Sequence, residues 1–338
     1  MEPMSLSSQL RDRTSPASLF FEERFPRLRA AQQDVVARAS GIEILLPDTE
    51  DGYPWGSVGT AVDYRVRFAF PQSVAYADRW DFMAPEGFSL LVDRARELLP
   101  PLPAEEGACS QRLSGWAGPF FESLRDLLRA TGGQAVLSPE LEWGLASHCY
   151  VLGLYDAVHR AGTAMPSPLY DVPAMAGVAA ISRLCPNGTI ADIVAMSHLF
   201  HRTQSELLTA GRVVLGHGLV GGRSVGGAGF DLIADGCLID VKAAKDLRNL
   251  TKSAWAWQLL GYALLDLNDA LAIRSVGLYL ARQGVFVELS VDDFCGLLGA
   301  CRPRSLASLR NDFQLALKRP DGHETSSTAT PIRGSEEI

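Results

Sequence analysis

The sequence predicts an α/β fold, with a mixed central sheet in the C-terminal half of the chain and a large helical region before it. The clearest observation is the dipeptide Asp235-Gly236 between two apolar, β-rich runs, because a type I′ hairpin turn needs positive φ at both central residues. Helical and extended patterns also alternate between residues 189 and 290. The 338 residues are 47% hydrophobic, so we expect a sizeable core, spread over about two domains.

Each element of the C-terminal half has its own pattern. Besides the hairpin, elements are expected at residues 189–210 (helix), 212–215 (strand), 252–267 (helix), 275–281 (strand) and 285–289 (strand). Upstream, residues 74–163 have a mainly helical pattern. Ser138-Pro139-Glu140 predicts the start of a helix there, because serine is a good N-cap and proline suits the first helical position. Gly162 is expected to end that helix.

The chain is expected to divide into four segments. These are residues 1–17 (disordered), 18–188 (N-terminal and mainly helical), 189–319 (the α/β core) and 320–338 (a disordered tail). The first segment is rich in serine and charge and the last lacks apolar residues, so neither is expected to fold. The proline-containing segments 99–106 and 164–173 are expected to be linkers.

The hairpin predicts which side chains share a face of the sheet. With the turn at residues 235–236, the facing pairs are Ala234–Cys237, Ile233–Leu238, Leu232–Ile239 and Asp231–Asp240. Because side chains alternate along a strand, Asp231, Asp240 and Lys242 are expected on one face. The opposite face is then apolar and suited to a core; its members are Leu232, Ala234, Cys237, Ile239 and Val241.

Two facing carboxylates need a counter-charge. Like charges directly opposite each other destabilise a strand pair by roughly 0.2–1 kcal/mol when exposed, and by more when desolvated. Asp231 opposite Asp240, with an ammonium two residues on, therefore indicates a cation site. A hard divalent ion such as Mg²⁺ is held by carboxylate oxygens, water and substrate phosphate. Lys242 is then placed to orient the attacking water.

Asp231 followed by Asp240-Val241-Lys242 resembles the paired acids and the (D/E)xK element of the PD-(D/E)xK nuclease superfamily. Phe230 stands where the superfamily's name has proline. Downstream, Gln258 and Tyr262 resemble the Gln-x-x-x-Tyr motif of the RecB-like branch, and their spacing puts both on one helical face.

The resemblance implies a fold and an activity. The superfamily core runs helix, three strands, helix and strand, and residues 190–290 fit that order. Residues 189–319 are thus expected to form a PD-(D/E)xK nuclease core. The activity implied is that of a nuclease that depends on Mg²⁺ or Mn²⁺ and hydrolyses phosphodiester bonds, with DNA favoured over RNA, in DNA repair or phage defence.

The resemblance also assigns roles to individual residues. Asp231, Asp240 and the backbone carbonyl of Val241 are expected to hold the metal. The lysine of the (D/E)xK element serves the nucleophilic water. Gln258 and Tyr262 position that lysine or a substrate phosphate.

A third acidic ligand is expected from further upstream. Gly59-Thr-Ala-Val-Asp63 resembles the Gly-x-x-x-His motif of RecB-like nucleases, with Asp63 where histidine would be. Hard cations favour oxygen ligands, so aspartate suits Mg²⁺. Glu206, on the helix before the sheet, is the rival. We rank Asp63 first and predict that its carboxylate lies within one coordination sphere of the Asp231/Asp240 pair.

Nucleic acid is the expected partner despite the overall acidity. A net charge of −8 argues against broad non-specific attraction to nucleic acid. Lys245, Arg248 and Lys252 directly follow Lys242, however, and we expect them to contact phosphates. The helical region is expected to shape substrate access or to dock a protein partner.

Two other function classes compete with a nuclease. One is a non-catalytic module that binds nucleic acid or protein on the same fold; the opposed carboxylates and the lysine argue against it. The other is a nucleotide enzyme that uses the G-x-G-x-x-G match at residues 216–221. Such a site requires a helix directly after the loop, and a glycine-rich stretch follows instead.

The composition points to a cytoplasmic protein with no membrane partner. The sequence has no run of 18 apolar residues and no basic segment followed by an apolar one, so neither a membrane span nor a signal peptide is expected. Its six cysteines show no C-x-x-C spacing, which fits a reducing compartment.

Overall fold

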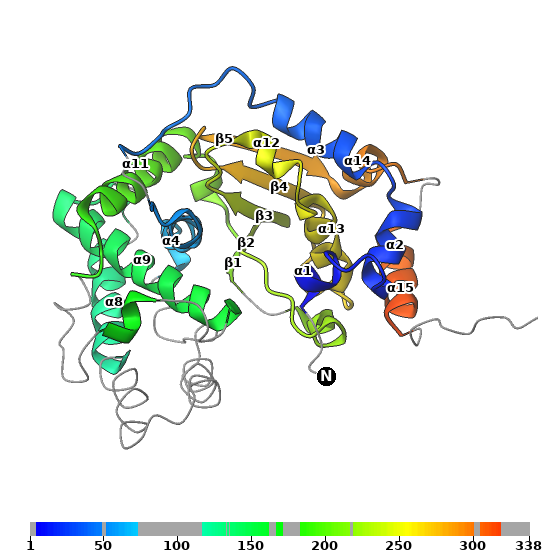
Figure 1. Cartoon of the computed structure of the whole chain (residues 1–338), viewed down its shortest axis with the longest axis horizontal. Helices are drawn as coiled ribbons and strands as arrows, with labels where there is room; N and C mark the ends of the chain where they lie inside the picture. The colour runs from blue at the N-terminus through cyan, green and yellow to red at the C-terminus, as the bar shows by residue number, and fades with distance from the viewer. Residues whose placement is uncertain are drawn as a thin grey trace, which may run out of the picture.

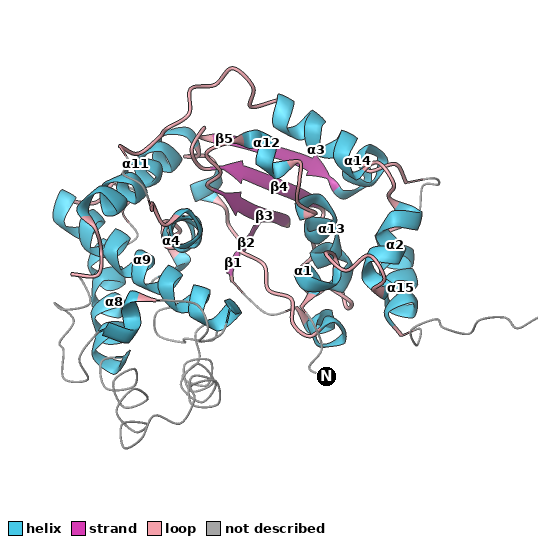
Figure 2. Cartoon of the chain, viewed as in Figure 1, coloured by secondary structure: helices cyan, strands magenta, loops and turns pink. Residues whose placement is uncertain are grey.

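A five-stranded mixed sheet lies at the centre of the protein, with helices on both sides of it (Figures 1 and 2). The computed structural model describes residues 5–48, 52–73, 117–132, 134, 136–161, 167–171, 183–216, 219–300 and 305–318. The expected α/β architecture with a mixed sheet is confirmed. The strands are β1 (Val213–Leu215), β2 (Leu232–Ala234), β3 (Cys237–Lys242), β4 (Ser275–Leu280) and β5 (Val285–Ser290).

The strands lie in the order β1-β2-β3-β4-β5. Neighbours pair antiparallel except β3 and β4, which are parallel. A parallel pair requires a crossover connection, and α12 (Leu247–Leu250) and α13 (Trp255–Leu265) provide it. Since α11 (Asn187–Thr203) precedes β1, this half of the chain runs helix, three strands, crossover helices and strand, followed by β5.

The hairpin between β2 and β3 has the predicted turn and register. Asp235 and Gly236 have φ values of 46° and 84°, the two positive values that a type I′ turn requires. The paired residues are Leu232 with Ile239, Ile233 with Leu238, and Ala234 with Cys237. The Asp235 carboxylate also accepts hydrogen bonds from the backbone N–H groups of residues 211 and 212, which ties the turn to the start of β1.

Two hydrophobic layers cover the sheet, one on each face. The first contains side chains of α4 (Trp55–Arg67), α8 (Ala117–Thr131), α9 (Pro139–Ala161) and α11. The five side chains predicted for the apolar face of the hairpin all belong to this first layer; they are Leu232, Ala234, Cys237, Ile239 and Val241. Ile233 and Leu238, which alternate with them, belong to the second layer, so the hairpin is buried on both faces.

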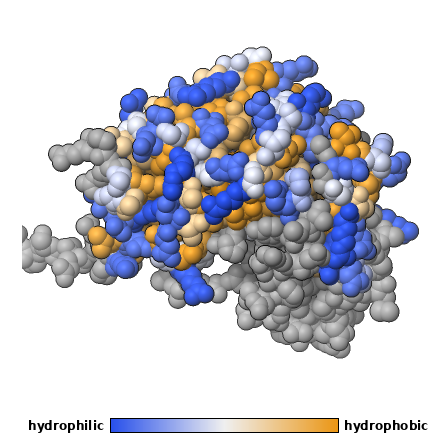
Figure 3. All heavy atoms as spheres, turned by 180° about the vertical axis from the view of Figure 1, so that it is seen from behind, coloured by the Kyte–Doolittle hydropathy of each residue, from blue (hydrophilic) through white to orange (hydrophobic). Residues whose placement is uncertain are grey.

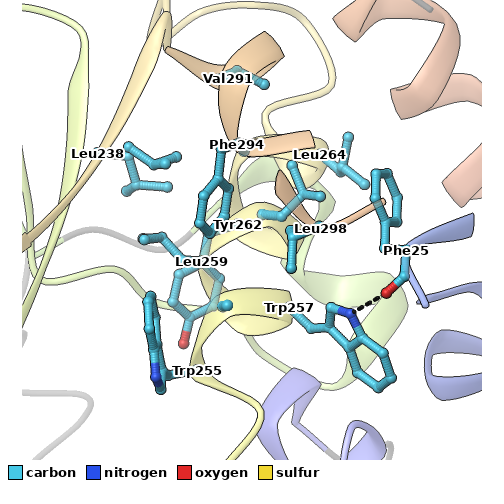
Figure 4. Packing of buried hydrophobic residues seen from close by; sticks show 14 of the residues in the cluster. Phe25, Leu238, Trp255, Trp257, Leu259, Tyr262, Leu264, Val291, Phe294 and Leu298 are labelled. Carbon is cyan, nitrogen blue, oxygen red and sulfur yellow. Dashed lines mark hydrogen bonds between the residues drawn. The ribbon is translucent and has the colours of Figure 1, made fainter. Parts of the chain in front are cut away.

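The second layer is built around α13, whose side chains are buried along most of its length. Around it pack α1 (Leu6–Gln9), α2 (Pro16–Arg24), α3 (Leu28–Ala37), α14 (Val291–Leu297) and α15 (Leu306–Leu317). Figure 4 shows Trp257 beside Phe25, whose carbonyl oxygen accepts a hydrogen bond of 3.0 Å from the indole N–H. The described helices of residues 18–188 are therefore divided between the two layers, with α2 and α3 in the second and α4, α8 and α9 in the first.

The expectation of disorder over residues 1–17 is wrong for residues 5–17. Ser5 and Ser15 cap α1 and α2 through their side chains. Leu6 is buried against Gly261 of α13, where an added Cβ would lie 2.9 Å from a Leu6 methyl group. Composition suggested a free segment because the packing partner of Leu6 on α13 is distant in sequence. Residues 1–4 and the expected tail at 320–338 lie outside the described residues.

The helix boundaries follow the predictions closely, with one exception. Helix α9 begins at Pro139 and ends at Ala161, as the capping pattern predicted. The helix expected over residues 189–210 ends at Thr203, and a turn and a short 3₁₀ helix, η2 (Leu207–Thr209), take its place. The expected linker at 99–106 lies outside the described residues, and the described part of the second linker is a 3₁₀ helix, η1 (Pro168–Asp171).

The loop that carries the G-x-G-x-x-G match is not followed by the helix that a nucleotide site requires. The glycine-rich loop leads into a six-residue 3₁₀ helix, η3 (Val220–Val225), and not into the α-helix of a dinucleotide site. Among the described residues, no helix is both long and apolar enough to cross a membrane. The face shown in Figure 3 carries hydrophilic residues interspersed with hydrophobic ones, as is usual for a protein surface.

Candidate functional site

Helix α4 is held in a defined position beside the sheet. It approaches α9 so closely that a Cβ added to Gly153 would lie 2.5 Å from the carbonyl oxygen of Ser57. Arg65 and Glu142 join the same two helices through a buried bidentate ion pair with N–O distances of 2.7 and 2.6 Å. Since α4 also contacts β3, these interactions bring its polar residues to the hairpin.

Asp240 and Lys242 lie on the same side of β3, as alternate residues of a strand must. The Lys242 ammonium lies 2.8 Å from Asp240 Oδ1 and 2.7 Å from Oδ2, so the two side chains form an ion pair at the end of the strand. Burial opposes the lysine charge, but the carboxylates of Asp240 and Asp231 outweigh it and raise the pKa of Lys242. In this structure the ammonium is therefore held in its protonated form.

Asp231 directly precedes β2, and continuing the register by one residue places it opposite Asp240. Its Oδ2 accepts a hydrogen bond of 2.9 Å from the backbone N–H of Val241, so its carboxylate turns toward β3. Burial, with a contribution from the Asp231 charge, raises the pKa of Asp240 to about 6 against the opposing effect of Lys242. The two acids therefore lie close enough to interact, as the hairpin predicted.

Asp63 is buried near the two hairpin acids and does not lie on the outer surface. It is 6% exposed, on the last turns of α4, and Arg67 binds it through Nε–Oδ1 at 3.0 Å and through a second, close Nη2–Oδ2 contact. The same Nη2 atom is 3.6 Å from Asp231 Oδ1. Burial raises the pKa of Asp63 to about 7, with Arg67 opposing and Asp231 and Asp240 adding to the rise.

The structure thus favours Asp63 over Glu206 as the neighbour of the two hairpin acids. Glu206 is exposed and begins the 3₁₀ helix η2. Asp63 was expected to share a metal ion with the hairpin acids. In this structure the guanidinium of Arg67 links Asp63 to Asp231 instead. Within the described ranges, no three histidine, cysteine, aspartate or glutamate side chains form a ready set of metal ligands.

Gln258 and Tyr262 meet on one face of α13, as their spacing predicted. The Gln258 amide donates hydrogen bonds to the Tyr262 hydroxyl at 2.6 Å and to the Ser7 hydroxyl at 2.8 Å. Burial raises the pKa of Tyr262, and the charges of Asp231 and Asp240 add to the rise. The tyrosine hydroxyl is therefore a protonated donor within electrostatic reach of both acids. The catalytic roles of Gln258 and Tyr262 stay a prediction.

The two hairpin acids are open to a divalent ion, whereas Arg67 occupies the Asp63 carboxylate in this structure. Asp231, Asp240 and the carbonyl oxygen of Val241 are hard oxygen donors, and Mg²⁺ is often held by one or two carboxylates while it keeps several waters. Asp240 Oδ2 is buried and lies 2.7 Å from the Lys242 ammonium, whose hydrogen bond goes to Oδ1 instead. Asp231, Asp240 and the Val241 carbonyl are therefore donors of the kind that suits Mg²⁺ or Mn²⁺.

The basic residues after the site are differently placed. Lys245 is exposed, and its ammonium lies 4.7 Å from the centre of the Trp55 ring. Arg248 is paired with Asp246 at 2.9 Å, and Lys252 donates a hydrogen bond to the residue three before it. Among the described contacts, Arg248 and Lys252 each bind a neighbouring polar side chain, whereas Lys245 contacts the Trp55 ring.

Two residues of the site were missed by the sequence analysis. Arg67 carries a visible signal, since an aspartate and an arginine at i and i+4 face each other on a helix. Ser7 carries none, because its segment reads as disordered and its partner lies 251 residues away.

Comparison with known proteins adds no further assignment. No protein-family model, no curated protein and no solved structure matches the chain.

Proposed function

We propose that the protein is a metal-dependent nuclease with a RecB-like PD-(D/E)xK core, which hydrolyses phosphodiester bonds, with DNA as the preferred substrate. One observation carries the proposal. Asp231, Asp240 and Lys242 lie together at the open end of a buried hairpin. Burial there, with the charge of Asp231, raises the pKa of Asp240 to about 6. Strongly perturbed acids around a specific lysine are typical of functional sites.

The positions of the hairpin acids and Lys242 suit metal-dependent hydrolysis of a phosphodiester. Asp231, Asp240 and the Val241 carbonyl would hold Mg²⁺ or Mn²⁺, which when bound supplies positive charge to the phosphate and acidifies water. Lys242 holds a proton beside Asp240 and is placed to orient the attacking water. Gln258 orients the Tyr262 hydroxyl, which is left to donate to the lysine side of the site or to a phosphate oxygen.

The preference for nucleic acid rests on the surroundings of the site. A net charge of −8 makes broad electrostatic attraction weak, so phosphate contacts must be local. Lys245 is three residues beyond Lys242, exposed, and held over the Trp55 ring. An ammonium in that position suits the phosphate next to the scissile one. A DNA repair or phage-defence role is the setting that the superfamily resemblance suggests.

The test is a cleavage assay on labelled single- and double-stranded DNA and RNA, with Mg²⁺, Mn²⁺ or EDTA. We expect cleavage of at least one DNA substrate that requires the metal and is lost in Asp240→Asn. Asp292→Asn, which changes an exposed carboxylate on α14, is the matched control and should cleave normally. Binding of DNA without cleavage in either metal would favour the non-catalytic module instead.

A further inference from the structure

Arg67 takes the position of a counter-ion between two acids from different parts of the chain. Its guanidinium binds Asp63 one helical turn back through two nitrogens and approaches Asp231 of the hairpin at 3.6 Å. Its side chain is 11% exposed, and that of Asp63 8%. A buried arginine shared by two carboxylates does what a bound cation would do, since it neutralises acids that would otherwise repel each other.

The fold makes room for this guanidinium. Gly216, which follows β1, has a φ of 30°, and a Cβ added there would lie 2.4 Å from Arg67 Nη1. The carbonyl oxygen of Asp231 also accepts a hydrogen bond from the backbone N–H of Gly216, which keeps the two segments together. On its other side, the guanidinium lies 4.7 Å from the centre of the Tyr64 ring. The glycine that resembled part of a nucleotide loop is thus explained by the arginine beside it.

The charges of the site cannot all be satisfied once a divalent ion is added. Without metal, Asp63, Asp231 and Asp240 face the two cations Arg67 and Lys242. A dication at Asp231 would lie beside the guanidinium and repel it. With Asp63 also drawn to the ion, the guanidinium would need another anion, and a phosphate oxygen pair matches its planar, bidentate geometry as well as a carboxylate does.

We propose that Arg67 has two alternating partners: it holds Asp63 and Asp231 in the metal-free protein, and it binds a phosphate of the nucleic acid when a divalent ion takes those carboxylates. The inference rests on the proposed function, because it assumes that the hairpin acids bind a divalent ion. It adds a residue to the substrate-binding set and explains how Asp63 is released to become a ligand.

The experiment is a calorimetric titration of the metal-free protein with Mn²⁺, comparing wild type, Arg67→Gln and Arg67→Lys. Loss of a close charge pair commonly changes affinity by about tenfold or more, so we expect Mn²⁺ to bind Arg67→Gln about tenfold more tightly. Arg38→Gln is the matched control, because it breaks the i,i+4 pair with Asp34 at 3.2 Å on the exposed face of α3. Its Mn²⁺ affinity should equal that of wild type.

The second half of the inference is tested with an oligonucleotide in Ca²⁺. Arg67→Gln should bind the DNA several-fold more weakly than wild type despite its tighter metal site, and Arg67→Lys should lie between them. Unchanged or weaker Mn²⁺ binding by Arg67→Gln would overturn the inference while leaving the proposed function intact. Absence of any Mn²⁺ binding by the wild-type protein would overturn both. If Arg67→Gln does not fold, an Arg67→Met titration decides by the same signs, because methionine also removes the charge while it keeps an apolar stem in the same space.

Discussion

The ionisation of Asp240 makes the stability of the metal-free protein depend on pH in a predictable way. Burial and Asp231 raise the pKa of this carboxyl from the ordinary value of 3.8 to about 6. The folded state therefore favours the protonated form, and this contribution to stability is fully present below about pH 4 and is lost as the pH rises through about 6. The whole difference corresponds to ~3 kcal/mol, of which ~1 kcal/mol falls between about pH 5 and about pH 8.

Replacing Asp240 by asparagine removes this pH dependence, because the amide does not ionise. We expect the free energy of unfolding of Asp240→Asn, relative to wild type, to rise by ~1 kcal/mol between about pH 5 and about pH 8. The assay is urea denaturation in EDTA across that range. Asp292→Asn should show a constant difference from wild type, because its carboxylate is exposed. A constant difference for Asp240→Asn, or a growing loss of stability at high pH, would mean that the ion pair with Lys242 outweighs the cost of burial and would refute this reasoning.

Lys242, Arg282 and Gly153 each make a contact whose loss has a measurable consequence. Lys242→Ala should abolish cleavage and leave Mn²⁺ affinity equal or higher, because a competing charge is gone; markedly weaker binding by calorimetry would show that Lys242 organises the site instead. Arg282→Met should cost ~3–5 kcal/mol in urea denaturation, because the arginine is fully buried against Asp192; addition of Asp192→Leu should recover part of the loss, and an unaltered stability would contradict a structural pair. Gly153→Ala should cost ~1–3 kcal/mol by overpacking α4 against α9 and should reduce cleavage, because α4 carries Asp63 and Arg67; wild-type stability would show that the two helices separate freely.

The features predicted from the sequence are those with local causes. The Asp235-Gly236 turn sets the hairpin register, because only a few residues accept positive φ. Ser138 caps the start of α9, where its hydroxyl accepts a hydrogen bond from the backbone N–H of Leu141. The pairing of the hairpin acids follows by arithmetic from the turn. The meeting of Gln258 with Tyr262 follows from their spacing on a helix.

The features that were missed depend on contacts between distant segments. Residues 5–17 lack a strong pattern of their own, and the burial of Leu6 depends on the room that Gly261 leaves on α13. The buried Arg282–Asp192 pair joins residues 90 positions apart. Arg67 was missed for a related reason. Its spacing from Asp63 is visible, but the approach to Asp231 depends on the packing of α4 beside the hairpin.

The most direct test of the metal-site claim is the position of Mn²⁺ in a crystal of the protein, located by its anomalous scattering. We predict one ion bound by the carboxylates of Asp231, Asp240 and Asp63, with the Arg67 guanidinium moved away from Asp63 and Asp231. A crystal with no Mn²⁺ at the hairpin, or with the ion at acids elsewhere on the surface and Arg67 still bound to Asp63 and Asp231, would contradict the account.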